Sequence, residues 1–389
     1  MRFRVRTLNN ISPKGLERFP AGRYETGPEI RRPDAILVRS ADMHGMDIPA
    51  SVLAVGRAGA GTNNIPVPLL SQRGVPVFNS PGANANAVKE LVLAGLFLGA
   101  RHIGPALDFV RGLDLSGDEL EAAVEEGKKR FVGHELPGRV LGVVGLGAIG
   151  VEVANAAHLL GMHVLGYDPQ ITVQRAWQLS SGVEQALSLE DLFTRSHAVT
   201  VHVPLTDATH GLVNAKRIGL MPEGATVLNF ARASIVDEAA VVAALRGGRL
   251  AAYVCDFPSA TLRGVPGVVA LPHLGASTSE AEENCAMMVA DTLLDFLEHG
   301  NIRHSVNFPE AALPRIPATA RIVIANSNVP NMVGQISTRL ADAGLNIADL
   351  LNKSKGELAY TLIDIDGKVP AGLVERISSI QGVLSARAV

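Results

Sequence analysis

Three glycines form the part of the sequence whose spacing points most directly to a chemistry. Gly145, Gly147 and Gly150 give G-x-G-x-x-G after a short apolar run and before apolar residues at helical spacing. Between a strand and a helix, such glycines allow a tight turn and bring a pyrophosphate close to the backbone at the helix N-terminus. The pattern therefore predicts a dinucleotide site that includes Ala148 and Ile149.

An acidic residue follows at the distance at which it can select the cofactor. Asp168 lies 18 residues after Gly150, at the end of the second predicted strand of this unit. A carboxylate there accepts hydrogen bonds from both ribose hydroxyls and repels a 2′-phosphate, so we expect NAD rather than NADP. A glycine-rich turn that binds no ligand is the alternative.

Other chemically versatile residues also fall at or just after the ends of predicted strands. These strands cover residues 198–203, 226–230, 250–255 and 268–271. A parallel sheet would gather their carboxyl ends along one edge, where ligands bind in open α/β sheets. The residues so placed are Asp168, Pro204, Arg232, Asp256 and His273.

The first 95 residues repeat the alternation of short strands and helical segments, which predicts a second α/β unit. Its loops after strand ends contain candidate substrate ligands. Ordinary turns with solvated arginines are the alternative. The candidates are Arg39, Ser40, Arg57 and Asn84.

Composition limits the classes of function. The chain has 389 residues, 47% of them apolar, and a net charge of −3, which favours separate globular cores and gives no basic surface for nucleic acid or membrane. The N-terminus lacks a signal-peptide core, and the apolar run 91–100 is too short to span a bilayer. Two isolated cysteines, Cys255 and Cys285, predict neither a disulfide framework nor a metal site, so we expect a cytoplasmic protein.

The remaining pattern predicts three domains. Ser279 and Glu282 form a potential capping box before a helix to His299, and a linker is expected from Asn307 to Thr319. A small α+β unit of strand, helix, strand, helix and strand follows it. We expect a substrate-binding domain (1–97 and 284–310), an NAD-binding domain (98–283) and a C-terminal regulatory domain (319–389).

Several motifs together resemble one family. G-L-G-A-I-G, H-V-P-L-T, N-F-A-R, C-D-F-P and L-P-H-L-G-A-S-T are similar to those of the D-isomer-specific 2-hydroxyacid dehydrogenases, in particular the members that oxidise phosphoglycerate. R-I-V-I-A-N-S-N-V-P-N-M-V-G-Q-I and G-L-N-I-A-D-L resemble an ACT domain, a small-molecule-sensing module. The resemblance implies a Rossmann dinucleotide-binding domain inserted in a flavodoxin-like α/β substrate domain, followed by a ferredoxin-like α+β ACT domain.

The resemblance also implies catalytic roles. Arg232, in N-x-x-R, would hold the substrate carboxylate and polarise the reacting carbonyl, because its planar fork suits both tasks. His273, in P-H-x-G, would exchange the proton of the hydroxyl group. The residues expected to border the nicotinamide end of the cofactor are Pro204, Asn229, Ala231 and Asp256.

In relatives, positions matching the four candidate residues of the first unit bind the phosphate and carboxylate of phosphoglycerate, a dianion that cationic and amide donors suit. In the ACT domain, Asn328 and Asn346 match positions that hold an L-serine effector between paired modules in some relatives; a purely structural dimerisation module is the alternative. The histidine expected at Asn326 is missing. A homodimer or homotetramer is implied, joined at least through the dinucleotide domains.

The chain departs from the family pattern at three places. Thr261 stands where a catalytic glutamate normally orients the histidine, Ala233 replaces a glycine after N-x-x-R, and Pro330-Asn331 replaces Pro-Gly. Substitution of the glutamate by another acid is the alternative, but structural roles are expected for the acids that come next in the sequence. These acids are Glu280, Glu282 and Glu283.

The implied activity is NAD-dependent oxidation of 3-phospho-D-glycerate to 3-phosphohydroxypyruvate, the first step of L-serine biosynthesis. One alternative is another D-2-hydroxyacid dehydrogenase, of the glycerate or 2-hydroxyglutarate type. A second, motivated by Thr261, is a non-catalytic NAD-sensing protein that has kept the fold.

Overall fold

The computed structural model describes residues 2–317 and 319–389. Met1, in the predicted first domain, and Ala318, in the predicted linker, lie outside the described residues. The chain divides into unit 1, which runs to Asn84 and resumes at Ser279–Val389, and unit 2, which is Ala85–Thr278.

Unit 2 is built on a parallel sheet of seven strands in the order β12-β11-β10-β9-β6-β7-β8. The strand order reverses between β6 and β9, which makes this the switch point of a Rossmann-type sheet. The predicted α/β class is therefore confirmed for this unit. Its strands are β6 Val140–Val144, β7 His163–Tyr167, β8 Val183–Gln185, β9 Ala198–Val201, β10 Ala225–Asn229, β11 Leu250–Cys255 and β12 Val268–Ala270.

Helices cover this sheet. α3 packs against α6, β10 and β11, and its buried Val88, Val92 and Leu96 share a core with strand β6. Because this packing continues along the helix, all of α3 belongs to unit 2, whereas the predicted domain border falls at residue 97. The helices are α3 Ala85–Ala100, α4 Ile103–Arg111, α5 Gly117–Gly127, α6 Ala148–Leu159, α7 Val173–Ala176, α8 Leu189–Arg195, α9 Ala215–Leu220 and α10 Glu238–Arg246, with 3-10 turns η1 Lys128–Phe131 and η2 Ala233–Ile235.

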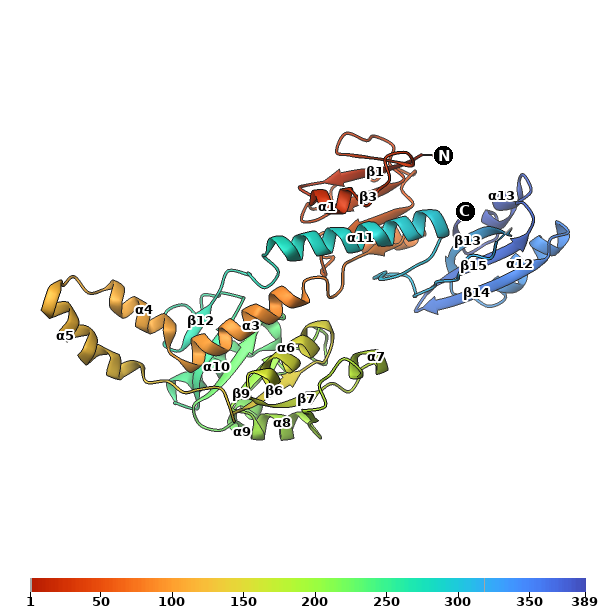
Figure 1. Cartoon of the computed structure of the whole chain (residues 1–389). Coiled ribbons are helices and arrows are strands. Elements are labelled where there is room, and N and C mark those ends of the chain that lie inside the picture. Colours follow the sequence, from red (N-terminus) through yellow and green to blue (C-terminus); the bar gives the residue numbers. More distant parts are fainter. Residues whose placement is uncertain (1, 318) are drawn as a thin grey trace. The chain divides into compact units, whose positions relative to one another are not determined.

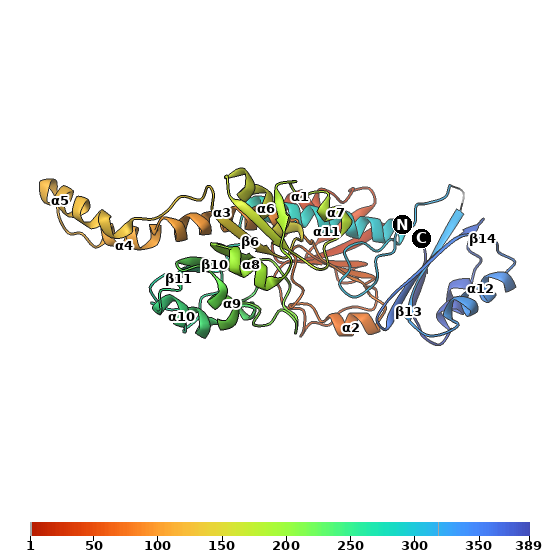
Figure 2. The same ribbon diagram turned by 90° about the horizontal axis from the view of Figure 1, so that it is seen from below.

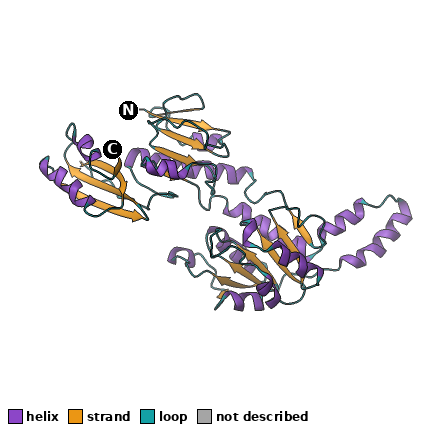
Figure 3. Ribbon diagram, turned by 180° about the vertical axis from the view of Figure 1, so that it is seen from behind, coloured by secondary structure: helices purple, strands orange, loops and turns teal. Residues whose placement is uncertain are grey.

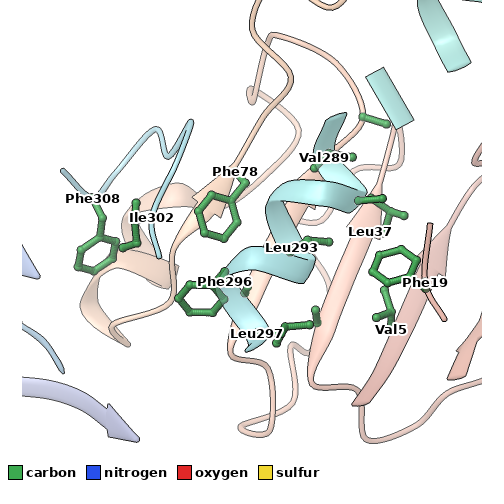
Figure 4. Close-up of a cluster of buried hydrophobic side chains, with 14 of the residues drawn as sticks. Val5, Phe19, Leu37, Phe78, Val289, Leu293, Phe296, Leu297, Ile302 and Phe308 are labelled. Carbon is green, nitrogen blue, oxygen red and sulfur yellow. The ribbon is translucent and has the colours of Figure 1, made fainter. Parts of the chain in front are cut away.

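Unit 1 begins with a five-stranded parallel sheet in the order β2-β1-β3-β4-β5. Helix α11 lies along one face of this sheet (Figures 1 and 2), and Val289, Leu293 and Leu297 pack there against Val5 and other sheet residues (Figure 4). The elements are β1 Phe3–Leu8, α1 Pro13–Leu16, β2 Tyr24–Gly27, β3 Ala35–Val38, β4 Ala54–Arg57, α2 Val67–Gln72, β5 Val77–Phe78 and α11 Ser279–His299.

The remainder of unit 1, residues 319–389, is a C-terminal module with a four-stranded antiparallel sheet in the order β14-β15-β13-β16 (Figure 3). The expected element order lacked β14. This strand is an edge strand whose second half is exposed and polar, so it carries no alternating apolar pattern. The elements are β13 Thr319–Ser327, α12 Met332–Asp342, β14 Ile347–Lys355, β15 Leu358–Asp366, α13 Leu373–Ser378 and β16 Val383–Ala388.

Both faces of the module's sheet are covered. Ile322 and Ile324 pack with α12 and α13, whereas Val323 and Ala325 point to the other face and join the core that contains α11. Phe308, 1% exposed and within the expected linker, belongs to the same core. The first part of that segment is therefore packed rather than free, because it fills the space between α11 and the sheet.

Among the described residues, no single helix is long and apolar enough to cross a bilayer, although α3 and α4 together, bent by 67°, meet the length and hydropathy required.

Candidate active site

The carboxyl ends of the parallel strands of unit 2 lie at one edge, as the sequence predicted. Six of the seven strands lead, directly or within three residues, to a residue with a proposed role, and the register of neighbouring strands places their ends side by side. β6 leads to Gly145, β7 to Asp168, β9 to Pro204, β10 to Asn229, Ala231 and Arg232, β11 to Asp256 and β12 to His273.

The glycine turn fits a pyrophosphate. Gly145 has φ 90°, and a Cβ there would lie 2.6 Å from the carbonyl oxygen of His202. A Cβ on Gly150 would lie 1.8 Å from the carbonyl oxygen of Gly145, so these two glycines are required by packing. A Cβ on Gly147 would meet nothing within 4 Å, and no side chain caps α6 at this end. Helix α6 starts at Ala148, followed by Ile149. The open space over this N-terminus suits phosphate oxygens.

Asp168 is held beside this turn. Its Oδ2 accepts from the amide of Leu146 at 2.9 Å, and its Oδ1 accepts from the amide of Gln170 at 2.9 Å. A carboxylate oxygen can accept more than one hydrogen bond, so both can still receive ribose hydroxyls. The negative charge opposes a 2′-phosphate, and the residues present therefore fit NAD.

A buried asparagine fixes the turn that carries Arg232. Asn229 is fully buried; its Nδ2 donates to the carbonyl of Arg232 at 2.9 Å, and its Oδ1 accepts from the amide of Ala231 at 3.1 Å. The Arg232 side chain is exposed, and its Nη1 donates to the carbonyl of Ala231 at 2.6 Å. The backbone is thus pinned, while the guanidinium keeps donors for a ligand. Pro204 is also exposed, and its carbonyl accepts from Thr209.

A buried aspartate fixes the turn that carries His273. Asp256 is 1% exposed, and its two carboxylate oxygens accept from the amides of Leu274 and Gly275, each at 2.7 Å. His273 itself has φ 57°, a left-handed conformation that costs energy in a residue with a side chain. Asp256 thus offsets that cost by binding the two amides that follow. Its expected contact with the nicotinamide stays a prediction.

The ring of His273 contacts Phe257 edge-on, with 5.4 Å between ring centroids. Thr261, at the expected position of the glutamate, is exposed in the turn that follows. Phe257 was not among the expected site residues. Its place directly after Asp256 was the available signal, but an aromatic residue after a strand is usually part of a core.

Unit 1 carries the predicted substrate ligands after its own strand ends. Arg39 and Ser40 follow β3, Arg57 ends β4, and Asn84 closes this part of the chain. Nε of Arg57 donates to the carbonyl of Arg39 at 3.0 Å, so the structure brings these two residues together. Asn64 braces the same turn, because its Nδ2 donates to the carbonyl of Ala41 at 2.8 Å.

Glu282 makes a contact that the sequence did not predict. Its carboxylate forms an ion pair with the Nη2 of Arg39, and the two side chains are 40% and 37% exposed. The residue expected to complete a capping box thus pairs with the residue that follows β3. No local pattern indicates a pair so far apart in sequence.

The doubly wound parallel sheet and the polar residues at its carboxyl edge are typical of an NAD-binding dehydrogenase domain. Residues 103–275 match the model of the D-isomer specific 2-hydroxyacid dehydrogenase, NAD binding domain. The chain belongs to the D-isomer-specific 2-hydroxyacid dehydrogenase family.

Two relatives cover most of the chain. The D-3-phosphoglycerate dehydrogenase of Haemophilus influenzae is 32% identical over 347 residues, 86% of this chain and 81% of that protein. The D-3-phosphoglycerate dehydrogenase of Dictyostelium discoideum is 31% identical over 412 residues, 99% of this chain and 97% of that protein. The structure of apo D-mandelate dehydrogenase from Rhodotorula graminis is similar with a TM-score of 0.68 and 25% identity, covering 81% of this chain and 100% of that one.

Proposed function

We propose that the protein is an NAD-dependent D-3-phosphoglycerate dehydrogenase that oxidises 3-phospho-D-glycerate to 3-phosphohydroxypyruvate, the first step of L-serine biosynthesis. The observation that carries this proposal is the similarity, at 31 and 32% identity over 99 and 86% of the chain, to proteins of that name. When bound at the glycine turn, NAD supplies the acceptor for the hydride. The residues of the chain bind and orient the substrate and move its proton.

Arg232 and His273 are proposed to carry the chemistry of the substrate. The exposed guanidinium of Arg232 would hold the carboxylate in a bidentate pair and stabilise charge on the reacting oxygen. The imidazole of His273 would accept the proton of the 2-hydroxyl group. Asn229 and Asp256 would act as positioning residues, since each holds the backbone of one of these two turns.

The phosphate of the substrate is proposed to be bound in unit 1. The hydrogen bond from Arg57 to the backbone of Arg39 supports a common site for these two cations. Ser40 and Asn84 would add neutral donors, and the substrate-binding domain would comprise the residues up to Asn84 with α11 and the segment that follows it to residue 310. A dianion requires such donors, because each charge-assisted hydrogen bond is roughly twice as strong as a neutral one.

The ion pair of Arg39 with Glu282 favours a second candidate, an unphosphorylated 2-hydroxy acid such as glycerate or 2-hydroxyglutarate. A carboxylate on Arg39 lowers the positive potential that a phosphate would meet. The same pair is compatible with phosphoglycerate if the phosphate displaces Glu282 from the guanidinium.

A substrate panel tests both candidates. Purified protein and NAD are supplied with 3-phosphoglycerate, D-glycerate or D-2-hydroxyglutarate, and NADH absorbance is followed. We expect kcat/KM to be highest for 3-phosphoglycerate and to fall by at least about a hundredfold for D-glycerate, because unpaired phosphate-binding groups carry a large penalty. A preference for D-glycerate would support the second candidate. Tight NAD binding with no turnover of any 2-hydroxy acid would indicate a non-catalytic NAD-sensing protein.

We propose that the C-terminal module is a ferredoxin-like ACT domain, residues 319–389, that binds L-serine between paired copies. Asn328 donates to the carbonyl of Gly356 and Asn346 donates to Asp366, so the two asparagines lie at opposite ends of the long β14–β15 pair. One module alone therefore cannot place both on one small ligand. The test is inhibition of the full-length protein by serine. Loss of this inhibition in both Asn328→Ala and Asn346→Ala would support the site, and inhibition that both variants retain would contradict it.

We infer a homodimer or homotetramer from the exposed apolar residues of unit 2. α4 has no buried residue, and its Leu107 and Val110 are 49% and 53% exposed. Such residues on a protruding helix pair favour a second copy as partner. Mass measurement in solution should give a dimer or tetramer, and Leu107→Glu should shift it toward a monomer.

A cytoplasmic location is proposed from the thiols. Cys255 and Cys285 are both free and buried, and burial raises the pKa of each thiol. Thiols of this kind are structural and persist in a reducing compartment.

A further inference from the structure

Unit 1 contains a cavity of about 370 Å³ between the C-terminal module and the first parallel sheet. It includes none of the residues assigned to the dehydrogenase reaction or to the proposed serine site. Both parts of the unit contribute to its wall, together with the last turns of α11. Among the lining residues are Ala50, Arg73, Phe296, Tyr360, Leu384 and Arg387.

The polar part of the cavity wall is cationic. Arg73 and Arg387 both line it, and none of its lining residues, all in the described part of the chain, is acidic. Arg73 donates to the carbonyls of Ile48 and Pro49, at 2.9 and 2.8 Å. Arg387 donates to the carbonyls of two residues in the last turns of α11, at 3.1 and 2.5 Å. A guanidinium has five N–H donors, so these contacts leave both arginines able to bind an anion.

The carboxylates of the neighbouring helix are engaged elsewhere. On α11, Glu298 accepts from Arg23 and from the hydroxyl of Tyr24, each at 2.8 Å. Asp295 accepts from Arg303 at 3.1 Å. The partial negative charge of the helix C-terminus offsets the charge of Arg387 in part, but Arg73 has no such compensation from α11. The charge balance of the cavity therefore favours an external anion.

The rest of the wall is apolar. Val52 and Leu53 come from the first part of the unit, Phe296 from α11, and Val323 and Leu384 from the module. A volume of about 370 Å³ is within the range of small-ligand pockets, which combine an apolar wall with a few convergent polar groups. The lining thus suits a molecule with one acidic group and a hydrocarbon body.

We propose that this cavity is a binding site for a small amphipathic carboxylic acid, with the carboxylate on Arg73 and Arg387 and the hydrocarbon chain against the apolar wall. Such a ligand contacts the module and the first sheet together. It therefore stabilises the docked position of the module, since any ligand that binds only the folded, docked state shifts the equilibrium toward that state.

Binding is tested on the full-length protein by calorimetry and by thermal unfolding, with hexanoate as the probe. Hexanamide and hexylamine are matched in length but are neutral and cationic. We expect hexanoate to bind and raise the unfolding temperature, and the amide and amine to bind at least about tenfold more weakly, because each charge-assisted hydrogen bond is worth more than a neutral one. Equal binding of hexanoate and hexanamide, or no binding of hexanoate at millimolar concentration, overturns the proposal.

Two variants locate the site. Arg73→Gln removes one charge, and Ala50→Phe, which starts from an exposed residue, fills the mouth of the cavity. Each should weaken hexanoate binding about tenfold. Arg18→Gln is the control, because Arg18 pairs with Asp291 on α11 and does not line the cavity. If Arg73→Gln fails to fold, the test depends on Ala50→Phe. If Ala50→Phe leaves hexanoate binding unchanged, the ligand binds elsewhere and the proposal is contradicted.

Discussion

Removing the charge of Asp364 should destabilise the C-terminal module more than any single exposed substitution. Arg321 and Asp364 are both 0% exposed, and they form a bidentate pair with two hydrogen bonds of 2.7 Å. The guanidinium also donates to the carbonyls of His299, Leu313 and Pro314, at 3.0, 2.9 and 3.0 Å. All five N–H donors of the arginine thus have partners, which is the condition for retaining a buried charge.

The magnitude follows from what Asp364→Asn leaves behind. An amide of the same size keeps the shape of the site but no longer neutralises a fully buried guanidinium. Breaking one side of a buried pair typically costs about 3–5 kcal/mol. This is a large fraction of the roughly 5–15 kcal/mol that stabilises a whole domain.

Hydrogen exchange of the β15 amides, followed with and without urea, measures this loss in the module itself. Asp366→Asn is the control, because Asp366 ends the same strand but is exposed; it should change the opening free energy by less than about 1 kcal/mol. Replacing both partners, Arg321→Met with Asp364→Leu, should recover only part of the stability, because the carbonyls of His299, Leu313 and Pro314 lose this donor. A loss of stability in Asp364→Asn no larger than that in Asp366→Asn would contradict the stabilising role of the buried pair.

Three further predictions concern unit 2. Burial lowers the pKa of His202 from its ordinary value of 6.5 to about 3. Below pH 6.5 the imidazole therefore binds a proton in the unfolded protein but not in the folded protein. The free energy of unfolding should fall as the pH drops below 6.5. Between pH 7 and pH 5 the free energy of unfolding, measured with urea, should fall by about 2 kcal/mol, and His202→Asn should remove this pH dependence. Asp168→Ala should narrow the preference for NAD over NADP in steady-state kinetics; a native protein that uses both equally would contradict the assigned role. Gly150→Ala should abolish NAD binding in titrations, because its Cβ would lie 1.8 Å from the Gly145 carbonyl oxygen, and undiminished binding would show that the turn relaxes at little cost.

The features that local pattern controls were predictable from the sequence. The central parallel strands, such as β3, β6, β9 and β10, are short, buried apolar runs, and their ends meet because parallel strands share a direction. Asp168 and the glycine turn could therefore be located before the fold was known. β14 could not, since an edge strand with an exposed polar half has no periodic signal.

Contacts between distant segments were not predictable in the same way. The sequence predicted Asp256 as a neighbour of the cofactor, but it did not show that both carboxylate oxygens accept from the amides of Leu274 and Gly275, far along the chain. The ion pair of Glu282 with Arg39 joins residues whose spacing in sequence has no structural period. The packing of Phe308 depends on how the module docks, which no local pattern encodes.

Helix α11 connects the two functional regions of unit 1. Near its start, Glu282 pairs with Arg39, and at its end the carbonyls of the last turns accept from Arg387 and Arg321. An α-helix of this length spans about 30 Å and is stiff, so both contacts belong to one rigid element. If the module docks differently, the first contacts to change are the hydrogen bonds from Arg387 and Arg321 to the carbonyls at the end of α11. A displacement of α11 along its axis would therefore move the Glu282 carboxylate that pairs with Arg39. This gives a physical route by which a ligand of the module could alter an anion site of the first sheet.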